Sequence, residues 1–162
     1  MQIIITMIVL KVRGAPAIAV VGCLSLAVEL RKLDSESTDS LCKFVVEKLD
    51  YLVTARPTAV NIGKAAEILK SFVCKESQKT ANVGELKMLL VGEIEVMLEN
   101  DIKDNMNIGN FGADHILKSA NGEKVKVLTH CNTGSLATVK YGTALGVVRS
   151  LQDKGKYNYI NK

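Results

Sequence analysis

The sequence predicts a helical domain followed by the first strand, loop and helix of a Rossmann-like α/β domain. Apolar residues recur at helical spacing through most of residues 13–120. A β-branched run at 124–129 then precedes a polar loop and another helical pattern, which is how an α/β unit begins. Only residues 157–160 offer a second strand, and one strand cannot make a sheet, so the α/β part is predicted to be incomplete.

Composition excludes several classes of protein. The chain has 162 residues, is 48% hydrophobic and 23% charged, and can therefore bury a core. Three Phe, four Tyr and no Trp argue against an immunoglobulin-like sandwich and against base-stacking platforms. The net charge of +4 is spread along the chain, so we expect no nucleic-acid partner.

Cysteine and histidine usage indicates neither a metal centre nor a disulfide framework. No two of the four cysteines lie within four residues of each other, and there are only two histidines. Three of the cysteines lie among apolar neighbours at helical spacing and are interpreted as small core residues. We expect the protein to reside in the reducing cytoplasm, and also in the nucleus.

The apolar start of the chain is not predicted to span a membrane. Residues 1–10 are uncharged and 14–28 nearly all apolar, but Lys11 and Arg13 separate the two runs. Neither run has the roughly 20 residues of a transmembrane helix, and a signal peptide carries its positive charge before the apolar run. We expect no membrane partner. Residues 1–12 are interpreted as an atypical strand-like segment.

Local signals place the first three helices. Pro16 suits a first helical turn, and the helix it begins is predicted to run to about residue 32 and to be central, because it is apolar all round. Ser37 or Thr38 can cap the second helix. Residues 54–58 form a loop in which Thr58 is predicted to cap a third helix that ends near residue 75.

The remaining elements are predicted with breaks between them. A fourth helix is expected from about 83 to 105, weakened at Gly92 by about 1 kcal/mol relative to Ala. A shorter helical stretch covers 113–119, and the helical pattern ends at residues 121–122. After the strand at 124–129, a helix is expected from 135 to about 154. The predicted domains are therefore 1–12, 13–120 and 121–162.

Two loops with an arginine lead into predicted helices. They read Arg13-Gly14-Ala15-Pro16 and Arg56-Pro57-Thr58. A helix N-terminus attracts phosphate through its free N–H groups and partial positive charge, and arginine adds a bidentate clamp. The alternative is a surface arginine beside an ordinary helix.

A third polar loop, Cys131-Asn132-Thr133-Gly134, follows the predicted strand. Open α/β sheets bind ligands at this edge, and a helix N-terminus favours a thiolate. The alternative is a turn with a buried thiol, and His130 is expected to make local contacts. These patterns name no substrate.

Three segments carry a resemblance to a known family. They read KVRGAPAIAVVGCLSLAVEL (11–30), LVTARPTAVN (52–61) and VLTHCNTGSLATVKYGTALGVVRSL (127–151). In this order they resemble the methylthioribose-1-phosphate isomerases of methionine salvage. That family shares a superfamily with regulatory subunits of translation initiation factor 2B and with ribose-1,5-bisphosphate isomerase. The resemblance implies an aldose–ketose isomerase that makes 5-methylthioribulose 1-phosphate from 5-methylthioribose 1-phosphate without a metal or organic cofactor.

The resemblance also implies roles for individual residues. Arg13, Gly14, Ala15 and Arg56 match positions that hold the phosphorylated sugar, and Cys131 matches a cysteine that stabilises the transition state. A homodimer is implied for the full-length family.

The match is incomplete, and two alternatives stay open. The family's acid/base Asp, a substrate-binding Gln and an Asn-Lys pair would lie beyond residue 162, and residues 1–10 and 156–162 depart from the family pattern. We therefore expect the 162-residue chain alone to be inactive. The alternatives are a non-catalytic regulatory or scaffolding protein like the initiation-factor subunits, and an isomerase of another phosphosugar such as ribose 1,5-bisphosphate. The three motifs together favour the first reading.

Overall fold

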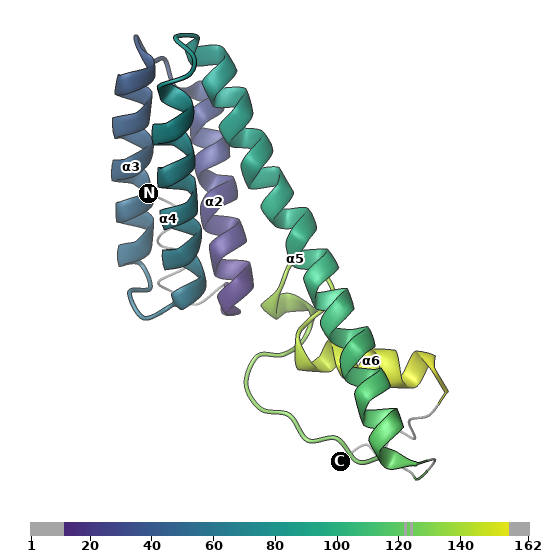
Figure 1. Ribbon diagram of the computed structural model, residues 1–162. Helices are drawn as coiled ribbons and strands as arrows, with labels where there is room; N and C mark the ends of the chain where they lie inside the picture. Colours follow the sequence, from purple (N-terminus) through teal and green to yellow (C-terminus); the bar gives the residue numbers. More distant parts are fainter. Residues whose placement is uncertain (1–11, 122, 124, 156–162) are drawn as a thin grey trace. The chain divides into compact units, whose positions relative to one another are not determined.

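The protein forms two compact units that share one long helix. The computed structural model describes residues 12–121, 123 and 125–155. The first unit is Met1–Glu99 and the second is Asn100–Lys162. Helix α5 (Val83–Ala120) runs through both (Figure 1). The boundary between the units therefore falls inside a helix, whereas the predicted helical domain ends at residue 120.

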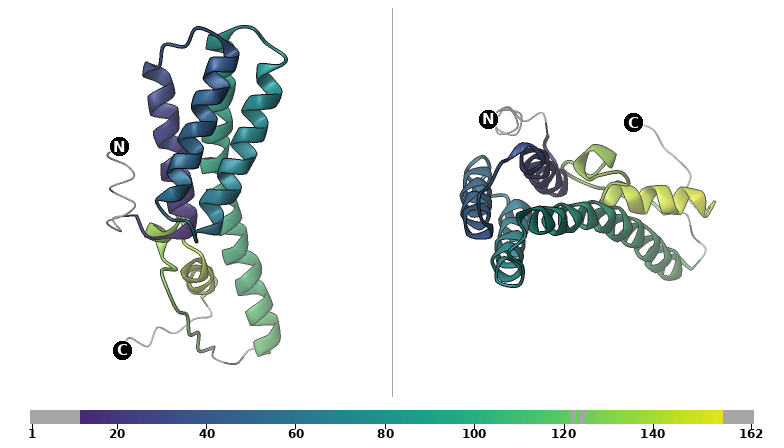
Figure 2. Two further views of the ribbon diagram at one scale, coloured as in Figure 1. Left: turned by 90° about the vertical axis from the view of Figure 1, so that its left-hand side faces the viewer. Right: turned by 90° about the horizontal axis from the view of Figure 1, so that it is seen from above.

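The first unit is an up-and-down helical bundle with an aliphatic core. Helices α2 (Ala15–Lys32), α3 (Thr38–Thr54) and α4 (Val60–Ser77) pack with the first part of α5, and α4 contacts both α2 and α3 (Figures 1 and 2). Large side chains from all four helices are fully buried, among them Ile18, Leu26, Leu30, Leu41, Leu49, Ile62, Leu69, Leu86, Leu90 and Ile94. Nine residues of α2 are buried, which confirms the expectation that this helix is central.

Two of the three predicted helix starts are confirmed and one is wrong. Helix α2 carries a proline in its first turn, and the backbone N–H of Ser40 donates to Ser37 Oγ at 3.1 Å at the start of α3. Thr58 does not cap α4. The N-cap is Ala59, because the Ala59 N–H first donates to the carbonyl of Arg56 at 2.9 Å, and this extra turn moves the helix start along the chain.

The prediction of two separate helices between 83 and 119 is wrong, because α5 is continuous over 38 residues. Gly109 and Gly112 lie inside the helix, in the interval left between the two predicted helices, and face helix α6 (Ala144–Asp153) of the same unit. A Cβ on Gly112 would lie 2.8 Å from Val147 Cγ2. These glycines therefore permit a close approach between two helices.

The predicted strand and the long helix after it are also wrong for the residues described. Residues 125–130 adopt no strand, and the described part of the chain contains none at all. A β-branched run becomes a strand only when a neighbour pairs with it. Downstream, a 3-10 helix η1 (Ser135–Ala137) and α6 replace the helix expected from 135 to 154. The predicted strands at 1–12 and 157–160 lie almost wholly outside the described residues.

None of the helices in the described part of the chain is long and apolar enough to cross a membrane.

Candidate functional site

The turn between α3 and α4 holds Arg56 in a fixed backbone position. Its N–H donates to the carbonyl of Val53 at 3.2 Å, and its own carbonyl accepts the Ala59 N–H at 2.9 Å. The Nη1 atom of Arg56 is buried and has no hydrogen-bond partner among the described residues. A buried donor without a partner costs on the order of 1–3 kcal/mol, more when charged. Arg56 therefore holds a strong donor to which no described residue offers an acceptor, and which suits a ligand or water.

The loop before α2 ends in an uncapped helix N-terminus. Gly14 is the N-cap, its carbonyl accepts the Ile18 N–H at 2.8 Å, and no side chain caps the helix. The first turn carries no acidic residue. Gly14 is buried, whereas Arg13 and Ala15 are exposed on either side of it. The first backbone N–H groups of a helix have no intrahelical acceptor, so this end of α2 favours an anion.

The structure brings these two loops to one end of the first unit. The chain runs up α2, down α3 and up α4, so that α2 and α4 begin at the same end of the bundle (Figure 1). Helix α4, like α2, starts without a side-chain cap and without an acidic residue in its first turn. Two helix N-termini, Arg13 and Arg56 thus give this end a positive electrostatic character.

Cys131 belongs to the second unit and differs from its expected setting. Its side chain is exposed, so the alternative of a buried thiol in a turn is wrong. No strand precedes it among the described residues, and the next element is the three-residue helix η1, so the expected long helix does not begin beside Cys131. The backbone of Cys131 has a φ of 76°. This left-handed conformation is rare for a residue with a Cβ and is most often retained at functional sites.

The segment after Cys131 is tied to helices of its own unit. The backbone N–H of Val139 donates to Asp101 Oδ2 at 2.7 Å, and the N–H of Leu145 donates to the carbonyl of Thr133 at 3.3 Å. Gly142, with a φ of 88°, lies where a Cβ would be 2.7 Å from the carbonyl carbon of Gly134. Only glycine fits this close approach, which folds the chain back on the cysteine loop.

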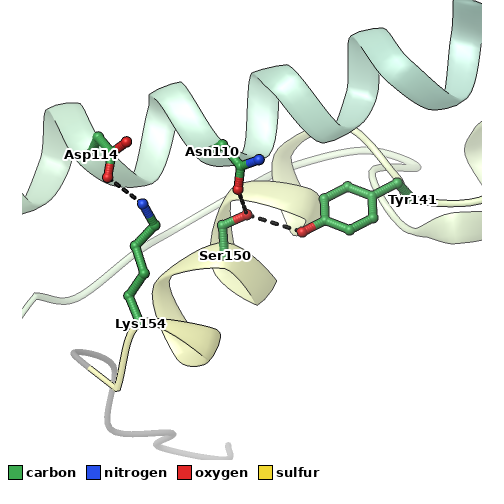
Figure 3. Close-up of polar contacts among 5 residues, drawn as sticks. All are labelled: Asn110, Asp114, Tyr141, Ser150 and Lys154. Atoms are coloured by element: carbon green, nitrogen blue, oxygen red, sulfur yellow. Dashed lines mark hydrogen bonds and ion pairs between the residues drawn. The ribbon is translucent and has the colours of Figure 1, made fainter.

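A polar cluster joins α5 and α6 beneath this segment (Figure 3). Ser150 Oγ lies 3.0 Å from the hydroxyl of Tyr141 and donates to Asn110 Oδ1 at 3.3 Å. Lys154 and Asp114 form an ion pair one turn farther along. Sequence reasoning missed these residues, because the partners on α5 and α6 are 40 positions apart and share no local motif.

No group of three His, Cys, Asp or Glu side chains that would suit a metal ion occurs within the described ranges.

Comparison with known proteins places this geometry in a family. The Initiation factor 2 subunit family matches residues 11–160. The chain belongs to this family.

Similar sequences carry an isomerase name. The chain is 49% identical over 160 residues to the methylthioribose-1-phosphate isomerase of Talaromyces stipitatus, and 48% identical over 151 residues to that of Nematostella vectensis. Each alignment covers 93% of this chain and 42% of the relative. The chain thus spans less than half the length of these relatives. The resemblance read from the three motifs is confirmed.

Solved structures agree with the sequence comparison. The 5-methylthioribose 1-phosphate isomerase of Pyrococcus horikoshii matches with a TM-score of 0.82 and 31% identity, over 96% of this chain and 42% of that one. The translation initiation factor eIF-2B subunit delta of A. fulgidus matches with a TM-score of 0.73 and 36% identity, over 96% of this chain and 43% of that one. Isomerases and initiation-factor subunits therefore share this fold.

Proposed function

We propose that this chain is the sugar-phosphate-binding N-terminal part of a methylthioribose-1-phosphate isomerase, which interconverts an aldose and a ketose phosphate in methionine salvage. The observation that carries the proposal is the buried, unpartnered Nη1 of Arg56, at the bundle end where two uncapped helices begin. The 49% identity to isomerases supports the choice of reaction.

The proposed binding chemistry follows from these groups. Arg56 and Arg13 supply cationic donors, and the backbone around Gly14 and Ala15 lets an anionic oxygen approach the start of α2. Charge-assisted hydrogen bonds of this kind are about twice as strong as neutral ones. We assign the substrate phosphate to this end of the first unit.

The proposed catalysis must overcome a blocked sugar ring. Phosphorylation of the C1 hydroxyl prevents the ring from opening as a free hemiacetal would, so the enzyme assists opening and then moves hydrogen between C2 and C1. In the proposal Cys131 stabilises the transition state from its exposed loop. The acid/base Asp that the family resemblance implies has no counterpart in residues 1–162, so the 162-residue polypeptide binds without turnover.

The test is substrate binding by matched arginine variants. Arg31 is the control, because it lies in the last turn of α2 and its side chain is 70% exposed, in a surface pair with Glu95. Calorimetry with 5-methylthioribose 1-phosphate should give about a 10–150-fold weaker affinity for Arg56→Ala, since a charge-assisted contact contributes about 1.5–3 kcal/mol. Arg31→Ala should bind like the parent. Equal affinities for the two variants, or loss of folding in Arg56→Ala alone, would make Arg56 a structural residue.

A second function, a non-catalytic regulatory subunit, is favoured by the match to the A. fulgidus delta subunit at 36% identity. It predicts no binding of 5-methylthioribose 1-phosphate. A parallel titration with ribose 1,5-bisphosphate separates the regulatory subunit from an isomerase of that sugar, since such an isomerase would bind the bisphosphate more tightly than 5-methylthioribose 1-phosphate.

We further propose a homodimer and a cytoplasmic location with a nuclear pool. Sedimentation velocity and imaging of a tagged chain test these two statements.

A further inference from the structure

Two cysteines face each other between the adjacent helices α3 and α4, at the end of the bundle opposite the proposed binding loops. Cys42 lies in the second turn of α3 and Cys74 in the last turns of α4, and their Sγ atoms are 2.9 Å apart. Of the three cysteines interpreted from the sequence as core residues, only Cys23 is buried, while Cys42 is half-buried and Cys74 is exposed. Core packing accounts for Cys42, which packs against the bundle core, but not for the exposed Cys74 beside it.

We propose that Cys42 and Cys74 are a redox-modification site, which closes to an intramolecular disulfide on reaction with a peroxide and reopens with a thiol reductant. A disulfide has an S–S length of about 2.05 Å, so the two sulfurs need to approach by less than 1 Å. The helices that carry them already pack side by side (Figure 1).

Exposure sets the order of the two steps. Burial, together with the neighbouring Cys74 thiol, raises the pKa of Cys42 to about 11, so Cys42 stays protonated near neutral pH. The exposed Cys74 meets the oxidant first. Its sulfur attacks one peroxide oxygen, becomes a sulfenic acid and releases the other oxygen as water. Cys42 then attacks the sulfenic sulfur, forming the S–S bond and releasing a second water. Two thiols lose two electrons, and hydrogen peroxide is reduced to two waters.

The other two cysteines provide internal comparisons. Cys23 is fully buried in the bundle core, and burial raises the pKa of its thiol to about 12, so it should resist oxidation. Cys131 is exposed and belongs to the second unit, so its replacement removes a reactive thiol without changing the α3–α4 pair.

The crosslink would act on the α3–α4 pair as a clamp. The turn that carries Arg56 joins these helices at one end, and the two cysteines lie toward the other end (Figure 1). They are 32 positions apart in sequence. Closing a loop of this length restricts the unfolded chain and should raise the unfolding temperature by roughly 5–15 °C.

The experiment is peptide mapping after peroxide treatment. The purified 162-residue chain is exposed to hydrogen peroxide, its free thiols are blocked with N-ethylmaleimide, and trypsin is added without reductant. Cys42 falls in the tryptic peptide LDSESTDSLCK and Cys74 in SFVCK. We expect these peptides joined, at a mass lower than their sum by two hydrogens, and separated again by dithiothreitol. Cys74→Ser should lose the joined peptide and the rise in unfolding temperature, whereas Cys131→Ser should keep both.

Two results would overturn the proposal. One is recovery of SFVCK with Cys74 blocked, or oxidised to sulfinic or sulfonic acid, and no joined peptide. The other is a joined peptide found only in covalent dimers on a non-reducing gel, which would place the bond between two chains.

Discussion

Replacing Gly109 by Ala should loosen the second unit, and the structure gives the size of the effect. A Cβ at this position would lie 2.8 Å from Tyr141 Cε1, 2.9 Å from Ser150 Oγ and 3.0 Å from the carbonyl oxygen of Gly146. The hydroxyl of Tyr141 lies 3.0 Å from Ser150 Oγ, and this hydrogen bond limits how far the ring can move away.

Two opposing terms set the net change in the unfolding free energy. Overpacking of a tight contact costs about 1–3 kcal/mol. Ala is a better helix former than Gly by about 1 kcal/mol, which offsets part of that cost. We therefore expect Gly109→Ala to be destabilising by roughly 0–2 kcal/mol. Gly92, on the same helix, is the matched control, because nothing lies within 4 Å of its Cβ position. Gly92→Ala should be stabilising by about 1 kcal/mol.

Hydrogen exchange of the two variants reads out the effect by segment. Gly109→Ala should speed exchange of backbone amides in α6, by up to about 30-fold for 2 kcal/mol, and leave α2 to α4 unchanged. Gly92→Ala should not speed exchange in either unit. If Gly109→Ala slows α6 exchange, as a helix-propensity gain alone would, then α5 and α6 do not pack through this glycine and the reasoning is refuted.

Three further outcomes are expected. Ser37→Ala should lower the unfolding free energy by about 1 kcal/mol in denaturant titrations, because it removes the cap on the Ser40 N–H, while Thr58→Ala should have little effect, because Thr58 caps no helix. The free energy of unfolding should fall as the pH rises from about 9 to about 12. Burial raises the pKa of Cys23 and keeps its thiol neutral in the folded state, whereas the unfolded thiol ionises near 9. Cys23→Ala should flatten this slope in denaturant titrations at each pH. The purified 162-residue chain should give no 5-methylthioribulose 1-phosphate by mass spectrometry, and turnover that Cys131→Ala abolishes would contradict this.

Helices were predictable where their signals are local. Ser37 and Pro16 mark helix starts through contacts within one turn, and α2 was correctly placed at the centre because it is apolar all round. Gly109 lies in the interval between the two predicted helices, and the sequence alone does not show that it packs against another helix. The contact of α5 with α6 was not predictable, since Asn110 and Ser150, which bond across the two helices, are 40 positions apart.

The difference between local signals and contacts between distant residues also applies to the candidate site. The arginine loops could be proposed from the sequence because a helix N-terminus and one adjacent side chain, the features that favour a phosphate, are both readable from sequence. The burial of Arg56 Nη1 could not be read from the sequence, because it depends on how the helices pack together. The contact between Cys42 and Cys74 depends on the same packing, at a separation of 32 positions.

The segment before Cys131 shows why the strand prediction failed. Val125 and Val127 are half-buried, but Leu128 is 98% exposed, so the alternation typical of a strand is present without a paired neighbour to make it one. The loop conformation does not need that sheet. Asp101 holds the segment through the Val139 N–H, within the second unit itself. The φ of 76° at the exposed Cys131 therefore occurs in a segment that contacts within the second unit hold in place.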